Sequence, residues 1–181
     1  MDAGMIERVV GWSKVKNTAA RRTLALVVGA LLFVVGMPLL IVFGARTLDG
    51  WLGLPRLAGD FWQAVVGAAL FVPGLVFALW SVWTQHAHAN GTPLPMVPTG
   101  RLLASGPFRL CRNPMTLGTV LVYLGMAVWL GSLSALLLVT TFGLLLVVYL
   151  KFIEEKELAA RFGEPYLVYK QETPFIIPRL R

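Results

Sequence analysis

The sequence has few charges for its size. Only 14% of its 181 residues are charged, whereas 57% are hydrophobic and the mean hydropathy is +0.73. Soluble domains contain about 25% charged residues, so this chain has too few to cover a globular surface exposed to water. The hydrophobic content also excludes a disordered chain. The single cysteine, Cys111, excludes a disulfide scaffold.

Long stretches of the chain contain no charged residue at all. They are residues 23–45, 61–85 and 113–150. Because a membrane-spanning helix needs about 20 apolar residues, the first two stretches predict one span each. The third is nearly twice as long and is interrupted by Gly131-Ser132-Leu133-Ser134.

The interruption predicts two antiparallel helices, 114–130 and 134–151, joined by a tight turn. Asn113 suits an N-cap and Pro114 the first helical position. Gly118 and Gly125 are seven residues apart and lie near one helix face, which favours close helix packing. The predicted fold is therefore an all-α integral membrane protein. It has about four transmembrane helices, of which the last two form a hairpin, followed by a C-terminal cytoplasmic helix and tail.

The basic residues predict the orientation in the membrane. Of 16 basic residues, 14 precede the first span, lie in the loop at 84–113 or follow the last span, and only Arg46 and Arg56 lie between the first two spans. The positive-inside rule therefore places both termini and the 84–113 loop in the cytoplasm. Residues 5–16 fit either an interfacial amphipathic helix or a charged anchor for the first span.

Functional polar residues are expected outside the spans. Transporters keep ionisable residues at membrane depth, and the four predicted spans have none, which argues against a transport path. The cytoplasmic segments 84–116 and 151–181 remain. The first begins with a proline-rich stretch, 84–98, which predicts a stiff extended loop. Its His86 and His88 have no nearby carboxylate or thiol, so no metal site is predicted.

Two motifs in these segments suggest a ligand site. Arg109 and Arg112 stand beside the N-terminus of the helix that starts at Pro114, where a carboxylate or phosphate can bind. Equally, they fit a plain anchor to anionic lipids. Glu154 and Glu155 follow the last span and suit hydroxyl groups or an ammonium, or are solvated helix charges. The apolar tail after Thr173 is expected to fold back over the site.

Several motifs together resemble the isoprenylcysteine carboxyl methyltransferase family, including its bacterial relatives. Phospholipid methyltransferases share the same layout. The resemblance covers about residues 84–181 and rests on these motifs: Gly91-Thr92-Pro93-x-Pro95, Gly106-Pro107-Phe108-Arg109-x-x-Arg112-Asn113-Pro114-Met115-x-x-Gly118, Glu154-Glu155-x-x-Leu158, Phe162-Gly163-x-x-Tyr166-x-x-Tyr169 and Pro174-x-x-x-Pro178.

The resemblance implies an integral membrane methyltransferase that uses S-adenosylmethionine. The cofactor would enter from the cytosol and a lipophilic substrate from the bilayer, in a bacterial-type inner membrane. Arg109 and Arg112 would position an anionic group of substrate or cofactor. The expected cofactor pocket comprises Gly106, Phe108, Asn113, Pro114, Met115, Glu154, Glu155 and Tyr166.

This sequence departs from the family at two positions. Many members have His where Asn113 stands and an aromatic residue where Thr116 stands. Asn does not titrate near neutral pH as His does, so no general base is assigned at position 113.

The domain expectation follows from this division of motifs. Residues 1–181 are predicted to form a single membrane domain. Its first part, 1–83, holds an N-terminal interfacial segment and two spans, and its second part, 84–181, is the methyltransferase-like catalytic half. Lipids are the expected partners, and nucleic acid is not.

Two other functions stay open. The first is a membrane reductase, because sterol reductases have a similar C-terminal layout and use NADPH, although no Gly-x-Gly-x-x-Gly motif is present. The second is a non-enzymatic scaffold that binds lipid head groups. The methyl acceptor also stays open among a carboxylate, an amine, a thiol and a phospholipid head group.

Overall fold

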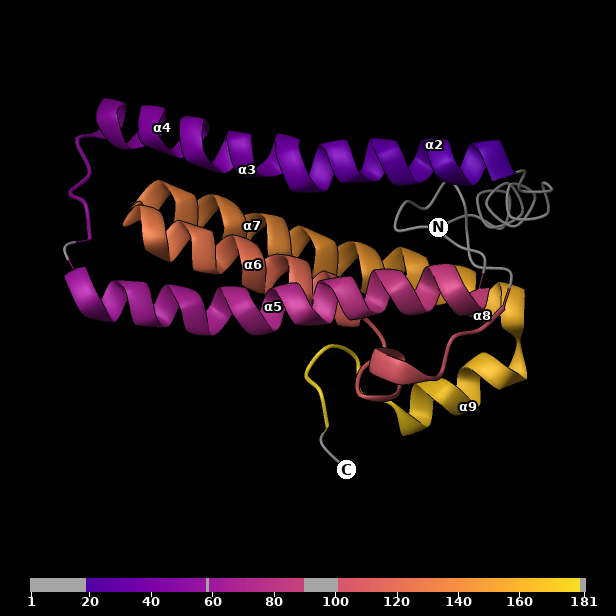
Figure 1. The fold of residues 1–181 in the computed structure, drawn as a ribbon. Coiled ribbons are helices and arrows are strands. Elements are labelled where there is room, and N and C mark those ends of the chain that lie inside the picture. The colour runs from indigo at the N-terminus through magenta and orange to yellow at the C-terminus, as the bar shows by residue number, and fades with distance from the viewer. Residues whose placement is uncertain (1–18, 58, 90–100, 180–181) are drawn as a thin grey trace. The chain divides into compact units, whose positions relative to one another are not determined.

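A computed structural model describes residues 19–57, 59–89 and 101–179, and these residues form helices and connecting turns without any strand. Three π-helical turns (η1, η2, η4) and one 3-10 turn (η3) accompany the α-helices. In chain order (Figure 1), the elements are α2 (Ala19–Ala30), η1 (Leu31–Gly36), α3 (Met37–Leu39), η2 (Leu40–Gly44), α4 (Ala45–Leu52), α5 (Asp60–Ala89), η3 (Gly106–Arg109), α6 (Pro114–Leu130), α7 (Leu133–Tyr149), η4 (Leu150–Glu154), α8 (Glu155–Phe162) and α9 (Glu164–Glu172).

Three helices are long and apolar enough to cross a membrane. They are Leu26–Leu52, Phe61–His88 and Leu133–Phe162. The apolar helix α6 has 17 residues and is shorter than these. The structure therefore indicates an integral membrane protein, and the number of four spans stays a prediction that depends on α6.

The predicted helix ends mostly agree with the structure. Helix α6 begins at Pro114, and α7 follows it after a two-residue turn whose Gly131 has φ +60°, a conformation that favours glycine. One expectation was wrong: residues 84–89 continue α5 and are not part of an extended loop. Their Thr-Gln-His-Ala sequence has no helix breaker, and the prolines begin only at Pro93.

By their contacts, the described residues form two compact units. The membrane unit comprises the described residues of 30–79 and 115–146, and the terminal unit those of 1–29, 80–114 and 147–181. The single-domain expectation for 1–181 stays a prediction. The expected interfacial segment at 5–16 lies outside the described residues, as does most of the proline-rich stretch.

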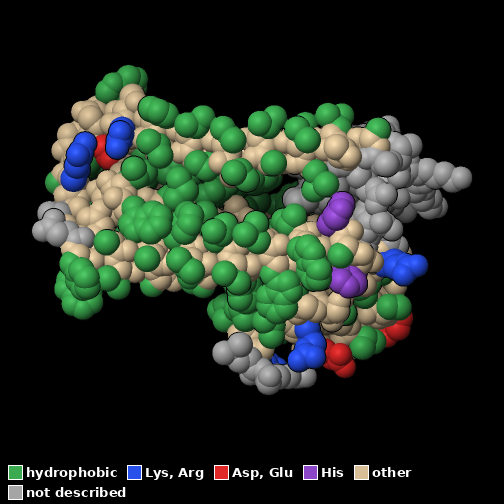
Figure 2. Space-filling view, in the orientation of Figure 1, with side chains coloured by type: hydrophobic (Ala, Val, Ile, Leu, Met, Phe, Trp, Pro, Cys, Tyr) green, Lys and Arg blue, Asp and Glu red, His purple; other side chains and the backbone are tan. Residues whose placement is uncertain are grey.

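The membrane unit has a small core and an apolar surface. Its core consists of Ile41, Ala45, Tyr123, Ala127, Ala135 and Val139. The Tyr123 hydroxyl donates to the Phe33 carbonyl at 2.7 Å, which satisfies a polar group that would otherwise be costly in this setting. On the face shown in Figure 2, hydrophobic side chains lie along the helices and charged side chains lie near helix ends.

Glycines bring α5 and α6 into close contact within this unit. A Cβ atom on Gly118 would lie 2.5 Å from the Ala78 nitrogen, and one on Gly125 would lie 2.7 Å from the Gly67 carbonyl oxygen. Gly74 in turn faces the Gly118 carbonyl. The expectation that Gly118 and Gly125 serve helix packing is thus confirmed.

Candidate functional site

Gly106 and Pro107 determine the shape of the loop before α6. Gly106 has φ +58°, and a Cβ there would lie 3.2 Å from Thr84 Oγ1. The buried Pro107 follows, and its carbonyl accepts bonds from the Leu110 and Cys111 nitrogens at 3.1 and 3.3 Å. This 3-10 turn directs the chain toward Arg112 just before α6 begins.

Arg112 forms a buried ion pair with Glu155, the first residue of α8. Nη1 of Arg112 lies 2.9 Å from Oε1 of Glu155, and the two side chains are only 9% and 6% exposed. A buried pair of this kind is costly to break, because removing one partner leaves the other charge unpaired in a poorly solvated place. The two charged motifs of the sequence therefore meet at this ion pair.

Two lysines and a phenylalanine complete this group, which we call the Glu155 cluster (Arg112, Lys151, Glu155, Lys170 and Phe175). Lys170 Nζ lies 2.7 Å and Lys151 Nζ 3.8 Å from Oε2 of Glu155. The Phe175 ring centroid lies 5.5 Å from Arg112 Cζ and 5.1 Å from Lys151 Nζ, within cation–π range. With three cations around one carboxylate, the cluster has a positive excess that suits an anionic ligand.

Hydrogen-bonding capacity in the ion pair remains unused. Although Nη1 of Arg112 and Oε1 of Glu155 are close, they are not aligned for a hydrogen bond. Both atoms, and also Nε of Arg112, are buried without a hydrogen-bond partner among the described residues. Buried polar groups are nearly always hydrogen-bonded, so these atoms have capacity for a further partner beside the Tyr166 hydroxyl, which interacts with the Arg112 side chain.

The C-terminal tail is hydrogen-bonded along the segment that contains Arg112. The Arg112 nitrogen donates to the Pro174 carbonyl at 2.9 Å, and the Arg179 nitrogen donates to the Leu110 carbonyl at 3.1 Å. The Asn113 side-chain amide donates to the Phe175 carbonyl at 2.9 Å. The tail therefore folds back onto this loop, as expected, and brings Phe175 to the cluster.

Two tyrosines of α9 support the loop from within. Tyr169 donates its hydroxyl proton to the Phe108 carbonyl at 2.6 Å. Tyr166 is buried, and its burial, together with the nearby Glu155 carboxylate, raises the pKa of its phenol to about 12. Burial also raises the pKa of Tyr169, so both hydroxyls are neutral at physiological pH.

Cys111 is not a reactive nucleophile. It is fully buried, and burial raises the pKa of its thiol to about 11. Since the thiolate is the nucleophilic form, the cysteine beside Arg112 acts here as a small apolar residue.

The structure places the other expected site residues as follows. Arg109 is exposed and, unlike Arg112, makes no ion pair with a described residue. Glu154 ends η4 and is half-buried, as are Phe108 in η3 and Met115 in the first turn of α6. Their roles in cofactor binding stay predictions, as do those of Gly106, Asn113, Pro114 and Tyr166.

Sequence reasoning missed three members of the cluster. Lys151 lies four residues before Glu155 on a helical stretch, and this spacing is a readable signal for an ion pair. Lys170 and Phe175 carry no such signal, because only the return of the tail and α9 brings them to Glu155.

Comparison with known proteins finds one matching family. A family model described as phospholipid methyltransferase matches residues 62–165, more than half of the chain. The matched range includes Arg112, Lys151 and Glu155 and ends before Lys170. No curated protein and no solved structure matches the chain with significant similarity.

Proposed function

Because the chain belongs to the phospholipid methyltransferase family, we propose that it is a membrane enzyme that transfers a methyl group from S-adenosylmethionine to a lipophilic acceptor at the cytoplasmic face. Family membership implies methyltransferase activity, and the long apolar helices indicate a location in the membrane. The cofactor, the acceptor and the face of the membrane are the parts that we propose.

The unused hydrogen-bonding atoms of the Glu155 cluster are the observation that most supports the cofactor. S-adenosylmethionine ends in an amino-acid group that has one carboxylate and one ammonium. The buried donors of Arg112 fit the carboxylate, and the buried acceptor Oε1 of Glu155 fits the ammonium. The residues present therefore fit the cofactor at its charged end.

The remaining predicted residues suit the other parts of the same molecule. Phe108 and Tyr166 are aromatic side chains of the kind that flank adenine. Glu154 offers a carboxylate for the ribose hydroxyls. When bound, S-adenosylmethionine supplies a methyl group activated by its positively charged sulfonium.

For this reaction the protein has to align its ligands and exclude water. Methyl transfer is an in-line displacement, and alignment of the reacting groups supplies much of its rate. The tail, bonded to residues 110–113, shields Arg112 from solvent. Asn113 already uses its amide to bind the Phe175 carbonyl, which supports a positioning role rather than that of a base.

Calorimetric titration of the purified protein in lipid nanodiscs tests the proposal. We expect S-adenosylmethionine and its demethylated product to bind and NADPH not to bind. Arg112→Gln should weaken binding by about tenfold or more, because a charged hydrogen-bond donor is lost. Arg101→Gln, at an exposed position outside the cluster, is the matched control and should bind as the unaltered protein does.

Two results would contradict the proposal. The first is the absence of S-adenosylmethionine binding to folded protein. The second is tighter binding of NADPH, which would select the reductase alternative. Transfer of a radiolabelled methyl group into the organic extract of membranes would then identify the acceptor class.

A further inference from the structure

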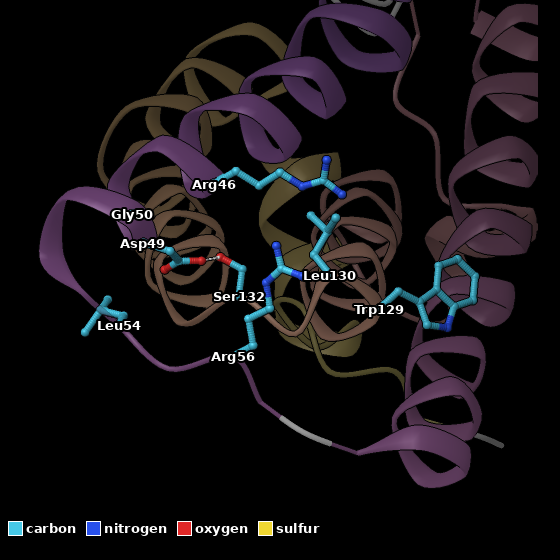
Figure 3. A pocket seen from close by; sticks show the side chains of 8 residues that line it. All are labelled: Arg46, Asp49, Gly50, Leu54, Arg56, Trp129, Leu130 and Ser132. Carbon is cyan, nitrogen blue, oxygen red and sulfur yellow. Dashed lines mark hydrogen bonds between the residues drawn. The ribbon is translucent and has the colours of Figure 1, made fainter.

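A polar cavity in the membrane unit shares no lining residue with the Glu155 cluster. Its volume is about 410 Å³, within the range of ligand sites. Arg46, Asp49 and Gly50 of α4 line it together with Leu54 and Arg56 of the following loop, and Trp129, Leu130 and Ser132 at the α6–α7 turn (Figure 3).

The only carboxylate lining this cavity is already used by the fold. Ser132 donates its hydroxyl proton to Oδ2 of Asp49, and the Ser134 nitrogen donates to Oδ1 at 3.1 Å. Ser132 Oγ in turn accepts from the Ala135 nitrogen at 3.0 Å. Asp49 and Ser132 thus satisfy the free N–H groups at the start of α7, where negative charge is favourable.

Arg46 and Arg56 line the cavity beside Asp49, whose carboxylate oxygens bind Ser132 and Ser134. Neither forms a salt bridge with any residue in the described part of the chain. Figure 3 shows both side chains reaching into the same opening, one from α4 and the other from the loop after it, while Asp49 turns toward Ser132. Each guanidinium group presents a planar fork of N–H donors that suits phosphate oxygens.

The surroundings of the cavity are those of a membrane–water interface. The apolar helix Leu26–Leu52 ends at it. Trp51, Trp62 and Trp129 near these helix ends are 83%, 73% and 43% exposed, and tryptophans gather at the level of lipid head groups. A ligand held here has a charged end among arginines and apolar neighbours beside it, which favours a lipid over a free ion.

We propose that this cavity binds the phosphodiester head group of a membrane phospholipid, with Arg46 and Arg56 donating to the phosphate oxygens and Asp49 keeping the α7 end in place. The site does not depend on the proposed methyltransferase function. It lies on the face that the distribution of basic residues predicts to be non-cytoplasmic, so its lipid serves anchoring rather than methyl transfer.

Native mass spectrometry of the full chain in detergent tests the site, with dioleoyl phosphatidylglycerol as the probe. We expect the unaltered protein to retain this lipid and the double variant R46Q/R56Q to bind it at least about tenfold more weakly, because two charged donors are lost. Arg101→Gln removes one positive charge elsewhere and should retain the lipid. Dioleoylglycerol, which lacks the phosphate, should not distinguish the double variant from the unaltered protein.

A second variant separates lost binding from lost folding. R46K/R56K keeps both charges without the planar fork, and it should bind the lipid with intermediate affinity. Equal retention by R46Q/R56Q and the unaltered protein, at equal thermal stability, would overturn the proposal. So would displacement of the lipid by equimolar glycerol 3-phosphate, since that would show a site for free anions rather than for lipid.

Discussion

Adjacent carboxylates at the start of α8 have different surroundings and should respond differently to substitution. Glu155 is buried and holds three cations, whereas Glu154 is half-buried and forms no salt bridge with the described residues. Glu155→Gln should lower the free energy of unfolding by about 3 kcal/mol, because Arg112 stays buried without its partner. Glu154→Gln should leave thermal unfolding nearly unchanged.

Both substitutions should also weaken S-adenosylmethionine binding, by about 1–3 kcal/mol each, the cost of a lost charged partner. Thermal unfolding and calorimetric titration on the same preparations separate the two effects. Unchanged affinity in both variants would show that neither glutamate contacts the cofactor.

At the level of residues, the sequence singled out Arg112 and Glu155 but not their pairing. The sequence predicts that Arg112 positions an anionic group of substrate or cofactor and that Glu155 lines the cofactor pocket, but each also fits a plain surface role. Their ion pair joins residues 43 positions apart in the sequence. A local sequence pattern does not indicate which residues so far apart come into contact. Lys170 and Phe175 were missed for the same reason, since the path of the tail decides where they lie.

Helix packing in the membrane unit depends on glycines at which a side chain has no space. Gly118→Ala should destabilise the protein, because the added Cβ would meet the Ala78 backbone, which cannot move aside as a flexible side chain does. The expected loss is about 1–3 kcal/mol, typical of overpacking. Thermal unfolding in detergent measures it.

Gly44→Ala is the matched control for this prediction. Its Cβ would lie 3.5 Å from a Leu40 methyl group, an ordinary contact. Equal stability of the two variants would show that α5 and α6 separate easily, and would contradict a role for Gly118 in their packing.

Elements whose ends have strong local signals were predicted closely. Pro114 starts α6, and Gly131, which has a positive φ, follows its end. The end of α5 was predicted wrongly. The prolines that begin at Pro93 suggested an extended loop from residue 84, whereas α5 continues to Ala89. A proline or glycine therefore predicts the end of a helix only when it lies directly at that end, and not several residues beyond it.

For the molecule as a whole, the exposed apolar surface indicates the membrane but not the direction of insertion. The basic residues supply that prediction: the loop between the first two spans should be non-cytoplasmic. In intact bacterial cells, Pro55→Cys should react with a membrane-impermeant thiol reagent. Lys156→Cys should react only after the membrane is permeabilised.

The natural cysteine does not disturb this measurement. Cys111 is fully buried, and the pKa of its thiol is raised to about 11, so it stays protonated and unreactive at neutral pH. The reverse labelling pattern would show that the positive-inside rule fails for this chain. It would also move the Glu155 cluster away from cytosolic S-adenosylmethionine.

At this scale, composition and motif order were sufficient to predict a membrane protein and its family. The number of spans was not, because α6 has only 17 residues and is shorter than the three helices that are long enough to cross a membrane. The positive excess of the chain, read first as a sign of orientation, also supplies the three cations around Glu155.

The way in which the tail is held has a consequence for how its sequence can diverge. Two of its bonds to residues 110–112 join backbone atoms on both sides, and the bond from Asn113 also ends on a tail carbonyl. Backbone atoms are the same whatever the side chain, so we expect most tail positions to accept substitutions. Insertions and deletions in the tail before Phe175 should not be tolerated, because they would move the Phe175 ring away from Arg112.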